Sequence, residues 1–185
     1  MEKIKMEKME SKKRQNEVLD MILDECEKNK LVAVKVPEEE AGIADMAVVR
    51  HSDKAKFSGE VLGEYYFLPV PESEKVFQYF VCSLTLSDDL DTEFAWAVQQ
   101  AISKINFTLS SGAFLMSPDQ KLLSFRYVLV QPVEQEISSM KLGIRAAMVN
   151  ALRATAKWKD ILSDMDSGKM EYNDFLKQFG KQLGC

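Results

Sequence analysis

Residues 75–86 constrain the fold more than any other segment, because their pattern predicts a β-strand that is apolar on both faces. One face carries Val76, Phe80, Cys82, Leu84 and Leu86, and the other carries Phe77, Tyr79 and Val81. A strand with this composition is expected to be covered on both sides. If helices cover one face of an antiparallel sheet, the second apolar face needs a cover from this chain or from a partner.

Length and composition favour one ordinary soluble domain, because the chain has 185 residues of which 46% are hydrophobic and 29% charged. The net charge of −5 opposes binding to nucleic acid or to anionic membrane. Neither a secretory signal nor a run of about 18 apolar residues is present. The three cysteines, Cys26, Cys82 and Cys185, are far apart and odd in number, which favours reduced thiols. We therefore predict a cytoplasmic protein.

Hydrophobic periodicity predicts the order of the other elements. Residues 1–30 form an amphipathic helix, and strands follow at 31–36, 46–49 and 61–70, the last with a turn at 71–74. After the strand at 75–86, residues 87–93 supply caps and first-turn acids for a helix that runs to about Phe107. A hairpin at 113–116 and 122–130, a long helix from Ile137 to about residue 165 and a short helix at 172–183 complete the chain.

This order predicts an α+β fold with an antiparallel sheet packed by helices in the order α-β-β-β-α-β-β-α. An N-terminal helical arm and an extra short C-terminal helix are added to that order. Residues 1–14 are the candidate mobile arm, and residues 15–185 are predicted to form a single domain. Gly143 in the long helix indicates either a close backbone approach or a kink.

Residues 92–132 carry a resemblance to a known family. The segment contains a helix with Ala97, Ala101 and Ile102, the turn 109–112, the strand 113–116, a Pro-Asp turn and the strand 125–128. This pattern resembles the YbjN type of the bacterial type III secretion chaperone-like superfamily. The resemblance implies a small acidic cytoplasmic protein, commonly a homodimer, that holds another polypeptide and performs no catalysis. The N-terminal arm, the strand-like stretch near Met46 and the helix after Gly168 depart from the family.

Candidate catalytic and metal-binding residues have simpler interpretations. His51 is the only histidine and lies in a polar stretch, so we expect an exposed loop residue and no catalytic triad. The acids at 88–93 are interpreted as helix caps, residues 38–40 as a solvated loop and residues 12–14 as a solvated helix face. The EF-hand-like stretch 166–175 places Met165 at a ligand position, which disfavours a hard cation. We predict no catalytic residues, no metal and no cofactor.

The remaining feature of the sequence is that it contains more apolar surface than one core can bury. The candidate partner or dimer surface consists of Phe77, Tyr79 and Val81 on the strand and Leu142, Ala146 and Val149 on the long helix. We predict a non-enzymatic binding protein, chaperone-like or regulatory, that holds a segment of an unidentified protein partner on this surface as a homodimer. The alternative is a small-molecule sensing or regulatory domain with a pocket between helix and sheet.

Overall fold

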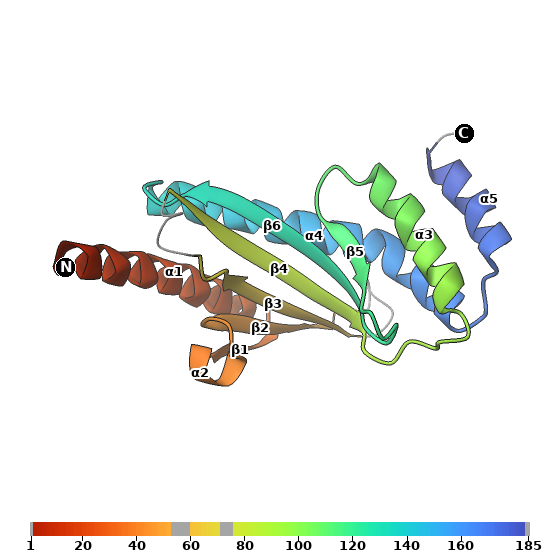
Figure 1. Ribbon diagram of the computed structural model, residues 1–185, viewed down its shortest axis with the longest axis horizontal. Coiled ribbons are helices and arrows are strands. Elements are labelled where there is room, and N and C mark those ends of the chain that lie inside the picture. Colours follow the sequence, from red (N-terminus) through yellow and green to blue (C-terminus); the bar gives the residue numbers. More distant parts are fainter. Residues whose placement is uncertain (1, 53–59, 71–75, 184–185) are drawn as a thin grey trace. The chain divides into compact units, whose positions relative to one another are not determined.

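The computed structural model describes residues 2–52, 60–70 and 76–183, and the side chains of all of these except residues 2–8 and 182–183. Within this described part, six strands form one open sheet and five helices accompany it (Figure 1). The elements are α1 (Glu2–Lys28), β1 (Val32–Val36), α2 (Glu38–Ala41), β2 (Met46–His51), β3 (Val61–Phe67), β4 (Phe77–Ser87), α3 (Ala95–Thr108), β5 (Ala113–Met116), β6 (Leu123–Pro132), α4 (Ile137–Asp166) and α5 (Tyr172–Leu183). The strand order is β1-β2-β3-β4-β6-β5. The predicted α+β fold with an antiparallel sheet is confirmed.

Three local features differ from the expectation. Four strands precede α3, one more than the order α-β-β-β-α gives, because the strand predicted at residues 46–49 is the full strand β2. Residues 38–40, expected as a loop, begin the short helix α2, which ends at Gly42 with a φ of 76°. α3 begins only at Ala95, and its N-cap residue Phe94 makes no side-chain cap hydrogen bond. The turn predicted at 71–74 lies outside the described residues.

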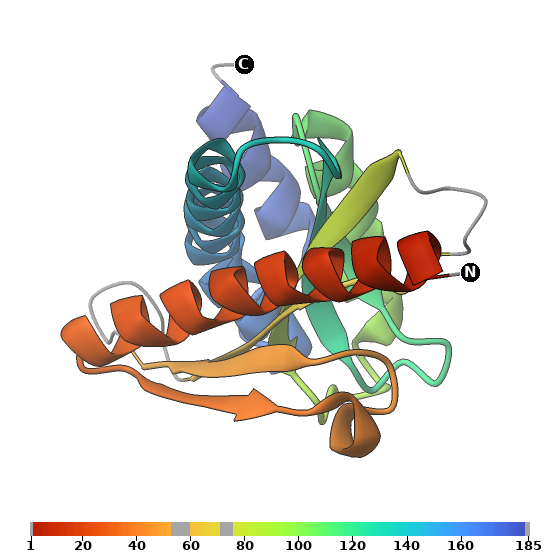
Figure 2. The ribbon, with the colours of Figure 1, turned by 90° about the vertical axis from the view of Figure 1, so that its left-hand side faces the viewer.

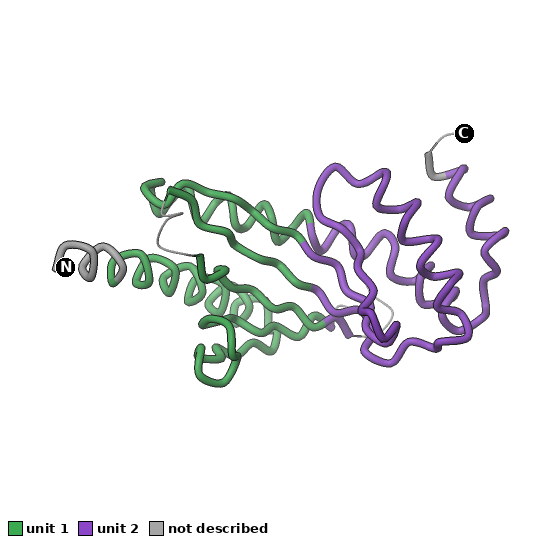
Figure 3. The backbone as a smooth tube through the Cα atoms, viewed as in Figure 1, with its two compact units in different colours: residues 1–51, 62–83, 127–150 green, residues 52–61, 84–126, 151–185 purple. Residues whose placement is uncertain are grey.

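Contacts divide the chain into two compact units (Figure 3). Unit 1 comprises residues 1–51, 62–83 and 127–150, and unit 2 comprises residues 52–61, 84–126 and 151–185. β4, β6 and α4 each contribute one part to unit 1 and another part to unit 2.

In unit 1, α1 covers the inner face of β1 and β2 (Figure 2). The helix buries one apolar face, which consists of Val18, Leu19, Met21, Ile22 and Cys26. β1 and β2 pair in antiparallel register, with Val34 opposite Val48 and Lys35 opposite Ala47. Alternation along the strands then directs Ala47, Val49 and His51 to the buried inner face.

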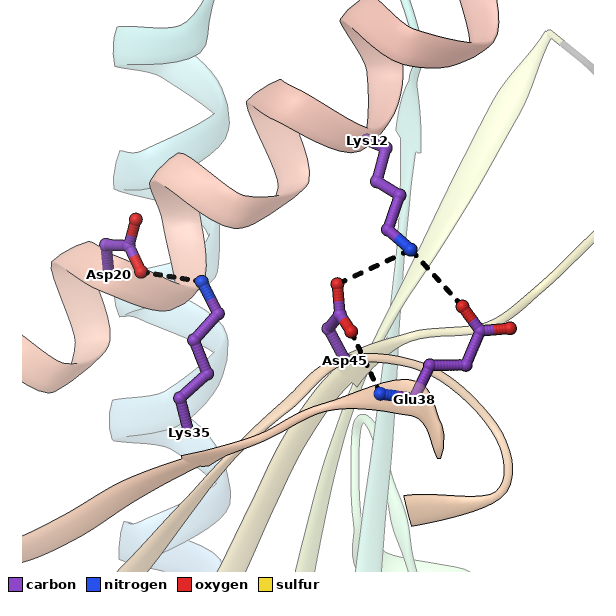
Figure 4. A network of polar contacts seen from close by, with 5 residues as sticks. All are labelled: Lys12, Asp20, Lys35, Glu38 and Asp45. Carbon is purple, nitrogen blue, oxygen red and sulfur yellow. Dashed lines mark hydrogen bonds and ion pairs between the residues drawn. The ribbon is translucent and has the colours of Figure 1, made fainter. Parts of the chain in front are cut away.

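Ion pairs join α1 to the segment around β1 and α2 (Figure 4). Lys12 Nζ lies 3.3 Å from Glu38 Oε2 and 3.6 Å from Asp45 Oδ2, and these contacts raise the pKa of the exposed lysine, the hydrogen bond to Glu38 most of all. Lys35 Nζ lies 2.8 Å from Asp20 Oδ1. Arg14 donates hydrogen bonds to the carbonyl oxygens of residues 133 and 135. Two residues of the predicted arm, Lys12 and Arg14, therefore contact the rest of unit 1, and residues 12–14 are not simply a solvated face.

The first part of α4 approaches β6 closely at Gly143. A Cβ on Gly143 would lie 2.7 Å from Nε2 of Gln131, a buried β6 side chain that donates to the Met140 carbonyl oxygen at 3.3 Å. The predicted close approach is that of another backbone, whereas the atoms that approach Gly143 belong to the side chains of Gln131 and Leu129. Gln78 of β4 also points to α4, where its Nε2 lies 3.3 Å from Met140 Sδ.

In unit 2, α3 packs on β5 and Asn106 fastens the two elements together. Its Oδ1 accepts the Phe114 amide at 2.8 Å, and its Nδ2 donates to the Phe114 carbonyl oxygen at 2.9 Å. Trp158, Phe175 and Phe179 form an aromatic cluster between α4 and α5. Gly168 ends α4 in the left-handed region, at a φ of 69°.

Candidate functional site

His51 is a buried residue of β2, so the expectation of an exposed loop histidine is wrong. Its Nε2 lies 2.8 Å from the hydroxyl of Tyr65, which is also buried. Burial lowers the pKa of His51 from its ordinary value of 6.5 to about 4 and raises the pKa of Tyr65 well above 10. Neutral His51 is thus part of the core of unit 1, because residues 47, 49 and 51 alternate onto the inner face.

The acidic residues at 88–93 do not cap a helix, contrary to the prediction. They lie in the turn before α3, where Asp91 Oδ1 accepts the amide of Glu93 at 2.9 Å. The amide of Asp91 in turn donates to Asp166 Oδ1 at 2.9 Å. Short polar side chains favour such local turns over helix interiors. Within the described residues, no group of three or more His, Cys, Asp or Glu side chains is placed to hold a metal ion.

β4 has one face that this chain covers along its whole length. Burial alternates along the first part of the strand, and the inner positions are the buried Gln78, Phe80, Cys82, Leu84 and Leu86. Burial also raises the pKa of the Cys82 thiol, as expected for a core cysteine. The opposite positions, 77, 79, 81, 83, 85 and 87, carry no charged residue. We call the side of unit 1 to which Phe77, Tyr79 and Val81 point its outer face.

Only part of the outer face is covered by the chain itself. Val81 is 0% exposed and packs with Met46 and Tyr66, against which Val36, Ala41, Val48 and Leu68 also pack. Two of these supporting residues flank or belong to α2, so the short helix and its neighbours supply a local cover. Val81 therefore contributes to the core and not to an exposed surface.

Phe77 is left exposed and Tyr79 is only partly buried, and β6 adds two valines beside them. Val133 N donates to Val76 O at 3.1 Å, and this antiparallel register, continued along the strands, places Tyr79 opposite Val130. Phe77 is 44% exposed, Val128 41% and Val130 50%, and Tyr79 is partly buried. We call these four residues the sheet patch. It lies wholly in unit 1 and contains no charge.

The α4 residues of the predicted surface form a second exposed group. Leu142 is 67% exposed and Val149 44%, and Ala146 between them is exposed as well. Their spacing of four and three residues places them on one side of the helix. We call these three residues the α4 stripe, and it also belongs to unit 1.

Two open grooves of unit 1 are lined mostly by charged side chains. The first, of about 390 Å³, lies between α1 and α4 and is bordered by Glu17, Asp20, Asp24, Glu25, Lys28, Lys141 and Arg145, with Met21. Arg145 forms an ion pair with Glu25 in this groove. The second, of about 440 Å³, lies near Arg14 and the residues that precede α4.

Comparisons with known proteins identify no family. No protein-family model matches the chain, and no curated protein matches it. Among solved structures, the chain is similar to the crystal structure of an uncharacterized protein from Methanothermobacter thermautotrophicus. The TM-score is 0.45 and the identity 14%, over 80% of this chain and 97% of that chain. A likeness of this size supports no statement about function.

The predicted surface residues are therefore separated by the structure into different environments. Phe77 and Tyr79 are joined by Val128 and Val130, which the sequence analysis missed. The sequence of β6 contains a signal for these two valines. The outer positions of this strand are polar at its start, with Ser124 and Arg126, and apolar further along, at residues 128 and 130. No helix in the described part of the chain is both long and apolar enough to cross a membrane.

Proposed function

We propose that this protein is a non-enzymatic cytoplasmic binding protein, chaperone-like or regulatory, that holds a segment of another polypeptide and acts as a homodimer. The observation that carries the proposal is the exposure of two apolar surfaces on unit 1, the sheet patch and the α4 stripe. Contiguous exposed apolar groups are typical of interaction surfaces, whereas single exposed apolar residues are ordinary.

Covering these side chains contributes part of the free energy that specific binding needs. Full burial of a valine, leucine or phenylalanine side chain contributes roughly 1.5–3 kcal/mol. Apart from the partly buried Tyr79, the side chains of the sheet patch and the α4 stripe are about half exposed or more, so each surface offers a few kcal/mol to a partner that covers it. Ordering the partner segment offsets part of this gain.

The α4 stripe suits a held segment. A helix that presents apolar residues at i, i+4 and i+7 can pack against an amphipathic helix or an apolar groove of a partner. The resemblance of residues 92–132 to YbjN-type chaperone-like proteins is in agreement with this role. The described structure has α3 and the β5–β6 hairpin in that segment, in the order that the resemblance implies.

An affinity pull-down from the native cell tests the proposal. The baits are the wild-type chain, Leu142→Asp and the double variant Phe77→Asp/Tyr79→Asp. The matched control is Phe107→Asp, because Phe107 is an almost fully exposed aromatic residue of unit 2 that belongs to neither surface. A polypeptide that Phe107→Asp retains and one of the other baits loses would then be purified, and its binding measured by calorimetry.

Two results would contradict the proposal. One is a captured polypeptide that binds all four baits equally in calorimetry. The other is a purified chain that binds no polypeptide but is stabilised against heat by a metabolite, which would favour the alternative of a small-molecule sensing domain.

A further inference from the structure

We infer that residues 9–17 of α1 form a strap that opens while the rest of unit 1 stays folded, and that Arg14 holds this strap closed. The inference goes beyond the proposed function, because it involves neither the sheet patch nor the α4 stripe. An open strap exposes the turn that precedes α4 and the first residues of that helix.

The strap and the remainder of α1 are attached to unit 1 in different ways. The described α1 side chains that are buried all lie after the strap, and they are Val18, Leu19, Met21, Ile22 and Cys26. Met9 is the apolar residue of the strap, and its side chain is 66% exposed. Because helices in proteins are stabilised mainly by burial of an apolar face, the strap lacks the contribution that fixes the rest of the helix.

Polar contacts hold the strap in place, and those of Arg14 are the strongest. Its guanidinium group donates hydrogen bonds to the carbonyl oxygens of Val133, at 2.8 Å, and of Gln135. Hydrogen bonds from a charged donor are stronger than those from a neutral one. Lys12 also forms ion pairs (Figure 4), but its side chain is more than half exposed and such pairs contribute little. We therefore assign most of the attachment of the strap to Arg14.

Like charges on the two sides of the second groove oppose the closed position of the strap. This groove lies between the strap and the residues that precede and begin α4, and the strap contributes Glu10 and Glu17 to it. The other side contributes Glu134 and Glu136, and Arg14 is the cation among the described lining residues. Carboxylates repel one another, although salt weakens this repulsion at a surface. Arg14 therefore offsets the repulsion in addition to forming its hydrogen bonds.

The same groove shows what an open strap exposes. Ile137 and Ser138, the first residues of α4, line it together with the preceding turn. When the strap leaves, this side of the groove loses its cover. Because burial in the described part of α1 begins at Val18, the helix can open up to that residue without exposing the core of unit 1.

Amide hydrogen exchange of the full chain, followed residue by residue by NMR, tests the inference through protection factors. The amides of residues 13–17 represent the strap, and those of residues 22–26 represent the rest of the helix. Arg14→Gln removes the two hydrogen bonds and one positive charge. Lys13→Gln is the matched control, because it removes the same charge from an exposed neighbouring residue of the same helix. The double variant Glu134→Gln/Glu136→Gln removes the repulsion and leaves the sequence of the strap unchanged.

We expect the strap amides of the wild-type chain to have protection factors at least about tenfold lower than those of residues 22–26. Arg14→Gln is expected to lower strap protection by a further factor of at least about five and to leave residues 22–26 unchanged. Lys13→Gln should change strap protection by less than about twofold, and the double glutamate variant should raise it about twofold.

A second replacement keeps the test decisive if Arg14→Gln does not fold, which circular dichroism reports. Arg14→Lys keeps the positive charge but offers a single ammonium group to the two carbonyl oxygens. We expect it to lower strap protection by less than Arg14→Gln does, and by more than Lys13→Gln does.

Four results would contradict the inference. Equal protection of residues 13–17 and 22–26 in the wild-type chain would mean that the helix opens as one unit. Equal losses in Arg14→Gln and Lys13→Gln would assign the effect to charge alone. A loss of the same factor throughout unit 1 in Arg14→Gln would make Arg14 a stabiliser of the whole fold. Unchanged strap protection in the double glutamate variant would remove the repulsion. None of these results depends on a bound polypeptide, so the proposed function is tested separately.

Discussion

His51 Nε2 and the hydroxyl oxygen of Tyr65 lie 2.8 Å apart in the interior of unit 1, and both side chains are buried. Gly63 of β3 permits this arrangement, because a Cβ there would lie 2.8 Å from the Tyr65 hydroxyl and 2.9 Å from His51 Nε2. Both partners of this hydrogen bond are neutral, because burial disfavours the charged form of the imidazole.

The stability of the fold is expected to fall between pH 6.5 and about 4. The pKa of His51 is about 4 in the folded chain and 6.5 when the side chain is exposed. Above pH 6.5 neither state is protonated, and below it the unfolded chain takes up a proton that the folded chain refuses. The free energy of unfolding therefore decreases as the pH falls, in total by on the order of 3 kcal/mol.

Urea unfolding at several pH values measures this effect, with His51→Gln as the control that cannot titrate. Acidic side chains contribute equally to both proteins, so the stability difference between wild type and variant isolates the histidine. A difference that stays constant from pH 7.5 to pH 4 would show that His51 is accessible to protons in the folded state. The NMR titration of this single histidine gives its pKa directly.

Tyr65→Phe is expected to lower the free energy of unfolding by about 1–3 kcal/mol, because it leaves a buried imidazole nitrogen without its partner. Thermal and urea unfolding at pH 7.5 measure the loss. A double-mutant cycle with His51→Gln tests its origin, and a coupling energy above about 0.5 kcal/mol is expected for groups in contact. Independent, additive effects would contradict the hydrogen bond.

The sequence predicts most of the fold because periodicity reports which side of each element is covered. Apolar spacing predicts α4 and α5, and the predicted end of α4 at about residue 165 and the predicted bounds of α5 at 172–183 agree with the structure. The predicted start of α3 is too early, because residues 87–93 resemble caps in composition. Their oxygen atoms bond within the turn, and Asp91 is held by Asp166, 75 positions away in the sequence. Such long-range pairing leaves no local signal.

The candidate surface was only partly predictable for the same reason. Val81 has the pattern of an exposed or partner-covered residue, but Met46 and Tyr66 cover it from other strands. Val128 and Val130 become part of the surface only because β6 lies beside β4. The burial of His51 follows from strand alternation, which the polar sequence around it obscured.

Gly143→Ala is expected to destabilise the protein by about 1 kcal/mol although alanine favours helices. The added methyl group would lie 2.7 Å from Gln131 Nε2, whose buried amide cannot move away without losing its bond to the Met140 carbonyl. Gly180→Ala in α5 is the matched control, since its Cβ meets nothing within 4 Å. That variant should gain about 0.5–1 kcal/mol. Equal gains in both variants would contradict the close approach of α4 to β6.

Asn106→Asp is expected to cost about 2 kcal/mol, because the carboxylate can still accept the Phe114 amide but cannot donate to the Phe114 carbonyl oxygen. Gln99→Glu makes the same amide-to-carboxylate change at an exposed position of α3 and should alter stability by less than about 0.5 kcal/mol.

Hydrogen exchange locates the effect of this substitution. If Asn106 fastens β5 to α3, the Phe114 amide should exchange faster in Asn106→Asp than in Gln99→Glu, while the core amides of unit 1 keep their relative protection. A uniform loss of protection in both variants would assign the change to the added negative charge. Loss confined to β5 and the end of α3 is the result that the two hydrogen bonds require.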